Sequence, residues 1–219
     1  MSVQIAGNAG VVLEVDEARN LQIAQTIPGY PAAGGFYSSS GWSAAAGTPA
    51  TPAVVAAALA TNTLLMSARL VVGSARKAYI TRLRVLLFPV TGVVTPVNSG
   101  VLSFMRFTAV TPTGGNARTA ARSSATKGSA SDMTDIRDLN AALTGAPTFG
   151  DIICSTQIPV IQGTPSATSL TQINGMEWIA EFATPIELAA GDGIALRTQA
   201  TCPATATWTY SWNMYWFER

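Results

Sequence analysis

The end of the chain, TATWTYSWNMYWFER (205–219), alternates between large apolar and small polar side chains. One set of alternate positions holds large side chains throughout: Trp208, Tyr210, Trp212, Met214 and Trp216. The positions between them, from Thr207 to Asn213, are Thr, Ser or Asn. Because successive side chains of a strand point to opposite faces, this pattern predicts a half-buried β-strand with a row of aromatic residues in the core.

The tip of this predicted strand departs from the alternation. Tyr215 and Phe217 place aromatic rings on the face that Thr and Ser occupy earlier in the strand. A strand that is apolar on both faces has to be covered on both sides. We therefore expect Tyr215 and Phe217 to contact either another subunit or the N-terminal loop of the same chain.

Three earlier segments also show strand patterns. In AYITRLRVLLFPV (78–90) aliphatic residues alternate with arginines, which predicts a strand of a sheet with one solvated face. The aliphatic set is Leu83, Val85 and Leu87, and the arginines are Arg82 and Arg84. LLMSARLVVG (64–73) is a second apolar run, and VLSFMRFTAV (101–110) is apolar at both sets of positions. We expect this last strand to be covered on both sides.

The C-terminal third predicts three consecutive strands. MEWIAEFATPIEL (176–188) alternates apolar residues with Glu177 and Glu181, and AAGDG (189–193) is a tight turn in which glycine tolerates positive φ. IALRTQA (194–200) is the return strand, followed by the final aromatic strand. Short turns between neighbouring strands predict an antiparallel meander.

The N-terminal region is less regular. Residues 11–27 alternate weakly and predict two short strands or an extended arm. Residues 28–52 are rich in Gly, Pro, Ser and Ala, which predicts irregular chain or a long loop. Its aromatic residues, Tyr30, Phe36, Tyr37 and Trp42, are candidate anchors. We predict an N-terminal arm and loop region at residues 1–60 and a β-sandwich domain at residues 61–219.

Two segments indicate at most one or two short helices. Pro52 followed by AVVAAALA can open one or two helical turns. In DMTDIRDLNAAL (132–143), Asp132 is a candidate N-cap and apolar residues recur at spacings of three and four. Strand–helix–strand alternation does not occur along the sequence, which disfavours an α/β fold. The predicted fold class is all-β, an antiparallel β-sandwich.

Charge is sparse in this sequence. Lys and Arg number 13, Asp and Glu 12, and charged residues make up 11% of the chain, against about 25% in a typical soluble domain. A surface with little charge promotes association, so we expect the protein to work inside an assembly. A net charge of +1 gives no electrostatic footprint for nucleic acid.

The N-terminus does not have the pattern of a signal peptide, and polar residues interrupt the most apolar window (52–73). We therefore expect a soluble protein made in a cytoplasm.

The residue types argue against several chemistries. The sequence has no His, which excludes Ser-His-Asp and Cys-His nucleophiles and most zinc sites. Cys154 and Cys202 do not form a CxxC motif, and we interpret them as small buried apolar residues, with a long-range disulfide as the alternative. We predict neither catalytic residues nor a cofactor or metal.

Three charged clusters are interpreted as surface decoration. They are Glu14, Asp16 and Glu17; Asp132, Asp135 and Asp138; and the basic residues Arg118, Arg122 and Lys127. The aspartates lack the terminal bidentate Glu of a calcium loop, and the basic residues lack interleaved aromatics. Glu177 and Glu181 of one strand lie about 13 Å apart in extended chain, more than the carboxylates of a glycosidase require.

The C-terminal pattern WIAEFATPIELAAGDGIALRTQA…WTYSWNMYWFER resembles the closing strands of jelly-roll virion proteins of tailed bacteriophages. In those proteins an apolar strand leads through an L..G(D/E)G turn to a return strand and a final aromatic strand. The segment SFMRFTAVTPTGGNARTAARSSATKGSASDMTDIRDLNAALT (103–144) is similar to the same proteins, and the resemblance covers roughly residues 63–219. It implies a jelly-roll-like sandwich and carries no residue-level function.

The resemblance also implies a structural role in the virion, assembled in the host cytoplasm. The expected role is that of a non-enzymatic capsid cement or decoration protein, with a head–tail or tail accessory protein left open. Expected partners are copies of the chain itself, as a homotrimer, and the major capsid protein or other virion subunits, without membrane or direct nucleic-acid binding. Candidate interface residues are Tyr215, Phe217, Trp42, Phe36 and Tyr37.

A carbohydrate- or receptor-binding β-module of a head or tail fibre is the alternative. Such a module needs exposed aromatic residues, and Trp42 with the loop residues Tyr30, Phe36 and Tyr37 are its candidates. An enzyme that uses carboxylates alone is a third, weaker hypothesis.

Overall fold

The computed structural model describes the strands at residues 3–6, 12–15 and 21–24 and the stretches 35–55, 59–91, 100–123, 130–158, 176–202 and 207–219. The chain forms two compact units, residues 1–34 together with Arg219, and residues 35–218. The described stretches contain strands, turns and bends but no helix. Accordingly, none of them offers a helix with the length and apolarity needed to cross a membrane.

The N-terminal unit contains a small antiparallel sheet. Its strands are β1 (Val3–Ala6), β2 (Val12–Val15) and β3 (Leu21–Ala24), in the order β1-β2-β3. Of the two alternatives predicted for residues 11–27, two short strands or an extended arm, the strands are found, as β2 and β3. β1 is an addition that the sequence pattern had not shown.

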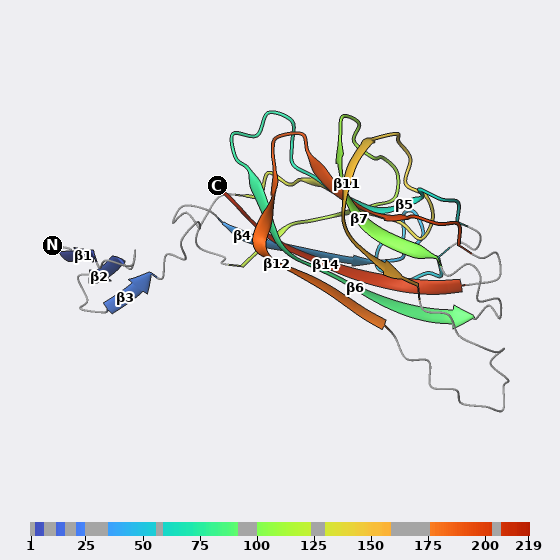
Figure 1. Cartoon of the computed structure of the whole chain (residues 1–219), viewed down its shortest axis with the longest axis horizontal. Coiled ribbons are helices and arrows are strands. Elements are labelled where there is room, and N and C mark those ends of the chain that lie inside the picture. The colour runs from blue at the N-terminus through green and yellow to red at the C-terminus, as the bar shows by residue number, and fades with distance from the viewer. Residues whose placement is uncertain are drawn as a thin grey trace, which may run out of the picture. The chain divides into compact units, whose positions relative to one another are not determined.

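The larger unit consists of two antiparallel sheets packed against each other (Figure 1), which confirms the predicted all-β sandwich. One sheet has six strands in the order β11-β7-β13-β5-β10-β8, and the other has five in the order β12-β6-β14-β4-β9. The six strands are β5 (Leu64–Arg69), β7 (Val101–Thr108), β8 (Asn116–Arg118), β10 (Asp135–Asp138), β11 (Thr148–Gln157) and β13 (Gly193–Thr198). The five are β4 (Phe36–Trp42), β6 (Ala78–Thr91), β9 (Ala121–Arg122), β12 (Met176–Leu188) and β14 (Thr207–Glu218).

The predicted C-terminal meander is wrong. β12 and β14 flank β6 in the five-stranded sheet, whereas β13 lies between β7 and β5 in the six-stranded sheet. All six residues of β13 are buried, and such a strand needs neighbours on both edges and cover on both faces. Gly193 fits this position because a Cβ there would strike the ring of Phe107 and the carbonyl of Ala68.

Strand β4 corrects the expectation that residues 28–52 are irregular. It pairs antiparallel with β14 from Phe36 opposite Phe217 to Trp42 opposite Ser211. Its sequence, FYSSSGW, has weak β-propensity, so the long-range pairing with the aromatic strand decides its conformation. The sandwich consequently begins at Gly35, not at residue 61.

The helix expected at residues 132–143 is also wrong. Asp135–Asp138 form β10, which pairs with β5 on one side and β8 on the other. Ile136 and Asp138 point to the buried side, so the local period is two rather than 3.6. The first described part of the other expected helix, residues 51–55, is not helical, and residues 56–58 lie outside the described stretches.

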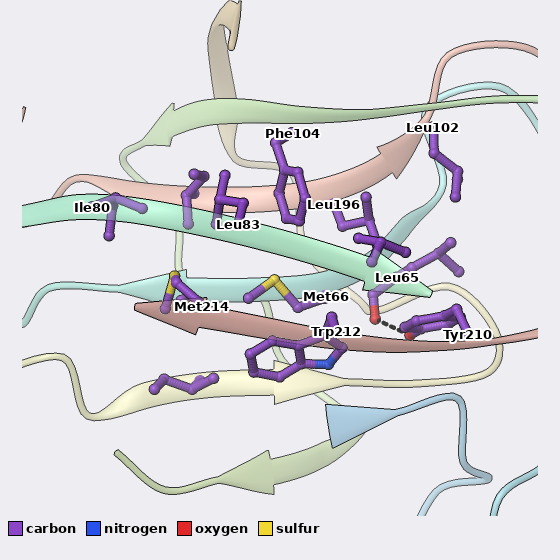
Figure 2. Close-up of a cluster of buried hydrophobic side chains, with 14 of the residues drawn as sticks. Leu65, Met66, Ile80, Leu83, Leu102, Phe104, Leu196, Tyr210, Trp212 and Met214 are labelled. Carbon is purple, nitrogen blue, oxygen red and sulfur yellow. Dashed lines mark hydrogen bonds between the residues drawn. The ribbon is translucent and has the colours of Figure 1, made fainter. Parts of the chain in front are cut away.

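The main core lies between the two sheets (Figure 2). The aromatic row of β14 is at most 1% exposed at every position, as the alternation predicted: Trp208, Tyr210, Trp212, Met214 and Trp216. It packs against aliphatic residues of β6 and against the inner face of the six-stranded sheet, including Leu65, Met66 and Phe104. The Tyr210 hydroxyl lies between the carbonyls of Leu65 (2.8 Å) and Leu139 (2.7 Å) and donates its single proton to this pair of acceptors, so its polar end is satisfied inside the core.

A smaller cluster covers the opposite face of the six-stranded sheet. Leu64, Phe107 and Ala195 pack there against Leu139 and Leu143. This cluster explains why β7 is apolar at both sets of positions, and it confirms the prediction that this strand is covered on both sides. Two short strands, β8 and β9, lie between β7 and β10 in the sequence.

Candidate functional site

The outer face of the five-stranded sheet, the face that points away from the main core, carries three of the five candidate interface residues at one end. These three are Phe36, Tyr215 and Phe217. Phe217 of β14 pairs with Phe36 of β4 on one side and with Tyr79 of β6 on the other. The ring of Phe217 lies 4.8 Å from that of Tyr79 and 5.9 Å from that of Phe36. Phe217 is 3% exposed and Phe36 52%. Phe217 therefore contacts the N-terminal region of its own chain, one of the two alternatives expected for it.

Tyr215 lies on the same outer face and is 38% exposed. It is paired with Ser38 on β4 and Arg82 on β6, and the guanidinium of Arg82 lies 5.7 Å from the centre of its ring. A further subunit that would cover Tyr215 stays a prediction. Ile179 of β12 and Phe88 of β6 are further exposed hydrophobic residues that the sequence reading had not singled out.

The two remaining candidates lie elsewhere. Tyr37 is 1% exposed and stacks on Trp216 at 5.8 Å, so it belongs to the core. Trp42 lies at the far end of β4, where the guanidinium of Arg118 sits 4.7 Å from the centre of its ring system. The structure thus brings Phe36, Tyr215 and Phe217 to one end of the outer face and leaves Trp42 at the other.

Ion pairs link β12 to its neighbour β6 and to Lys77, the residue that directly precedes β6. Glu177 pairs with Arg84, Glu181 with Arg82 at 3.3 Å, and Glu187 with Lys77. These side chains are all more than a third exposed, so each pair adds little stability. The carboxylates that were weighed for glycoside hydrolysis are therefore neutralised in pairs on a surface with balanced charge.

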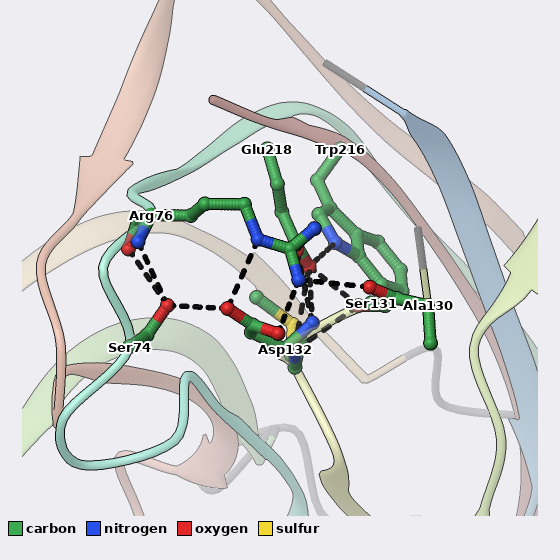
Figure 3. Close-up of polar contacts among 8 residues, drawn as sticks. Ser74, Arg76, Ala130, Ser131, Asp132, Trp216 and Glu218 are labelled. Carbon is green, nitrogen blue, oxygen red and sulfur yellow. Dashed lines mark hydrogen bonds and ion pairs between the residues drawn. The ribbon is translucent and has the colours of Figure 1, made fainter. Parts of the chain in front are cut away.

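A dense polar cluster lies where β14 ends (Figure 3). The carboxylate of Glu218 is fully buried and accepts hydrogen bonds from the Asp132 amide (2.9 Å), the Trp216 indole (3.0 Å) and the Ser131 hydroxyl. Arg76 lies 3.2 Å from the same carboxylate and also pairs with Asp132. The backbone amide of Glu218 bonds to the Gly35 carbonyl, so the end of β14 is tied to the residue that precedes β4.

The Asp132 carboxylate is held in its charged form by this cluster. Partial burial alone would raise its pKa, but hydrogen bonds from Ser74 and Arg76 and the charge of Arg76 outweigh that effect. The pKa of Asp132 consequently lies below its ordinary value. Asp132 is an ion-pair residue and not the helix N-cap that the sequence predicted.

Asp138 bridges the two sheets. It belongs to β10 of the six-stranded sheet, is fully buried, and accepts hydrogen bonds from Arg118 (2.9 Å), from the Trp212 indole (2.9 Å) and from the Trp42 backbone amide. Burial raises the pKa of Asp138, and these donors partly offset the rise. Gly41 provides the necessary room, because a Cβ at this position would strike the Asp138 carboxylate and the Trp212 indole.

The three aspartates that recur every third residue, at 132, 135 and 138, do not act as one cluster, because each pairs with a different arginine. Asp132 pairs with Arg76, Asp135 with Arg137, and Asp138 with Arg118. Within the described stretches no group of three His, Cys, Asp or Glu residues is arranged to hold a metal ion.

Arg118 is not the solvated loop residue that the sequence indicated, since its side chain is 11% exposed. Glu14, Asp16, Glu17 and Lys127 lie outside the residues whose side chains are described.

The cysteines are unpaired, as the main interpretation of the sequence held. Cys202 is buried and Cys154 half-buried, and they do not form a disulfide. Burial raises the pKa of each thiol to about 11. Both thiols therefore stay protonated near neutral pH and are poor nucleophiles.

A groove of about 540 Å³ lies beside Trp42, where β4 loses its neighbour. β9 pairs with β4 at Tyr37 and Ser38, and beyond this point the edge of β4 faces the stretch from Ala117 to Thr119. A second hollow of about 250 Å³ lies on the outer face and is lined by Trp42, Pro52, Phe88, Thr209 and Ser211, among others. Trp42 forms part of the wall of both.

Comparison with protein-family models, with curated proteins and with solved structures gave no significant match. The features available for a functional proposal are therefore the outer face, the polar cluster at the end of β14, and the groove at Trp42.

Proposed function

We propose that this chain is a non-enzymatic structural subunit of a bacteriophage particle, a capsid cement or decoration protein that binds neighbouring subunits through the outer face of its five-stranded sheet. The observation that carries the proposal is the set of large hydrophobic side chains exposed on this face. Tyr215 of β14 and Ile179 of β12 are exposed there, on either side of β6, although β14 and β6 bury their inner residues almost completely. Large apolar side chains that are exposed among polar and charged residues mark interaction sites.

The charges on this face support association with a protein surface. Arg82, Arg84 and Lys77 are each matched by a glutamate of β12, so the face has no strong field of one sign. A face of this kind can be buried against another subunit without leaving an unpaired charge. The sparse charge of the whole chain points in the same direction.

The bacteriophage particle as the setting is supported by the resemblance of residues 63–219 to jelly-roll virion proteins and by the two-sheet sandwich. The N-terminal unit, which forms a small sheet of its own, would provide a further surface for contacts with neighbouring subunits. Several copies acting together would stabilise a shell through many small interfaces rather than one strong site.

The test is quantitative mass spectrometry of purified particles of the phage that encodes the chain. We expect a copy number in a fixed ratio to the major capsid protein, retained after washing in high salt because the contact is apolar. Absence of the chain from washed particles would contradict the proposal. Particles assembled with the double variant Tyr215→Ser and Ile179→Ser should carry fewer copies than wild-type particles.

A further inference from the structure

We propose that the groove at Trp42 is a binding site for a neutral saccharide. This site is separate from the exposed aromatic end of the outer face, and the inference goes beyond the structural role proposed above. The first observation is the shape of the groove. Its volume of about 540 Å³ lies within the usual range of small-molecule sites, and it opens at the edge of β4 where β9 stops.

The second observation is a row of groups along β4. Ser38, Ser40 and Trp42 occupy alternate positions, so they share the outer side of the strand at a spacing of about 7 Å. The hydroxyls of Ser38, Ser40 and Thr119 have no hydrogen-bond partner among the described residues, and all three residues line the groove. Ser39, between them, is buried and donates its hydroxyl to the Thr119 carbonyl (3.1 Å), which ties the two walls together.

The third observation is that the Trp42 indole is held in place. Arg118 lies against its ring system at 4.7 Å and is itself fixed by Asp138, by the Pro49 carbonyl (3.1 Å) and by the Trp42 carbonyl (3.4 Å). An aromatic ring whose position is fixed in advance binds a ligand at a lower cost in conformational entropy. Trp42 also borders the second hollow, where Phe88 and the hydroxyl residues Thr209 and Ser211 continue the same mixture of aromatic and hydroxyl groups.

These features together select the class of ligand. A saccharide ring combines an apolar face of C–H groups with a rim of hydroxyls that both donate and accept hydrogen bonds, as the groove hydroxyls do. The guanidinium in the wall is neutralised by Asp138, so the groove offers no unpaired charge to an anionic ligand. An added peptide strand fits poorly, because Trp42 already uses its amide on Asp138 and its carbonyl on Arg118.

The proposal is tested by applying the full chain to an array of neutral and sialylated glycans. The neutral oligosaccharide bound most strongly is then titrated calorimetrically. We expect Trp42→Ala to weaken binding about tenfold or more through loss of stacking, and Trp42→Phe to retain part of it. Ser40→Tyr should abolish binding by filling the groove. Because this variant keeps Trp42, Arg118 and Asp138, it tests the site even if Trp42→Ala does not fold.

The matched control is Tyr215→Ala, which removes an exposed aromatic ring from the same face outside both hollows. It should bind the oligosaccharide as the wild type does, with thermal melting confirming that each variant is folded. Binding to no neutral glycan, binding to sialylated glycans alone, or binding that survives Ser40→Tyr would each overturn the saccharide site. The outcome is independent of the structural role, because incorporation into particles is measured separately and depends on Tyr215 and Ile179.

Discussion

The two faces of β14 differ in what surrounds them. The inner face is a continuous row of large side chains that is at most 1% exposed and is packed by both sheets. The outer face begins with half-buried Thr, Ser and Asn and ends with Tyr215, which is 38% exposed, and Phe217, which is covered by Phe36 and Tyr79. The inner row is covered by apolar contacts within the chain, whereas the outer face offers apolar surface that the described part of the chain does not cover.

This difference separates folding from association. Removing a side chain from the inner row creates a cavity, and the cost appears as a loss of folding stability. Removing one from the exposed outer face changes little within the chain, so its cost should appear in assembly. Substitutions on the two faces should therefore affect different measurements.

The largest expected effect is that of Trp212→Ala on the inner face. The substitution removes a fully buried indole and the hydrogen bond that it donates to Asp138, and we expect it to lower the free energy of unfolding by about 3–5 kcal/mol. The matched substitution on the outer face is Asn213→Ala, which should change it by less than about 0.5 kcal/mol. Urea denaturation followed by tryptophan fluorescence measures both, and similar losses in the two variants would contradict the comparison.

The next effect concerns the carboxylate that bridges the sheets. Asp138→Ala leaves Arg118, the Trp212 indole and the Trp42 amide without their acceptor, and we expect a loss of about 3 kcal/mol. Asp135→Ala in the same strand removes a partly exposed ion pair with Arg137 and should cost less than about 1 kcal/mol. Equal costs at the two positions, measured by chemical denaturation, would show that the bridge does not hold the sheets together.

A smaller effect depends on pH at the polar cluster where β14 ends. Because the pKa of Asp132 is lower in the folded chain than in the unfolded chain, its contribution is fully present above its ordinary pKa and is lost as pH falls through the lowered value. The groups that face it are Arg76 and Ser74, with Glu218 on the other side of Arg76. Wild-type protein should therefore lose more stability than Asp132→Asn between pH 5 and pH 2. Parallel stability curves for the two proteins in this range would contradict this account.

The sequence predicted features that depend on local periodicity. The aromatic row of β14, the alternation in β6, the cover on both sides of β7 and the all-β sandwich are confirmed, because period-two burial leaves a direct trace in the order of residues. Features that depend on distant partners were missed. β13 joins the other sheet, and β4 becomes a strand because β14 pairs with it, although serines and a glycine give it little propensity of its own.

The candidate sites show the same division. Tyr215 and Phe217 stood out because they break an alternation, but the burial of Tyr37 in the core follows from its position in a strand that the sequence did not reveal. The three aspartates at 132, 135 and 138 imitated a helical stripe, and the structure gives each a different arginine. The room for Asp138 depends on Gly41, nearly a hundred positions earlier, and the groove at Trp42 depends on where β9 ends.

The most direct test of the division between the faces is the molar mass in solution, measured by light scattering. The chain has a mass of 22.7 kDa, and we predict that the wild type elutes as a homotrimer of about three times this mass. The double variant Tyr215→Ser and Ile179→Ser should elute as a monomer with a melting temperature close to that of the wild type. A monomeric wild type, or a double variant that remains trimeric, would contradict the claim that the outer face is the assembly surface.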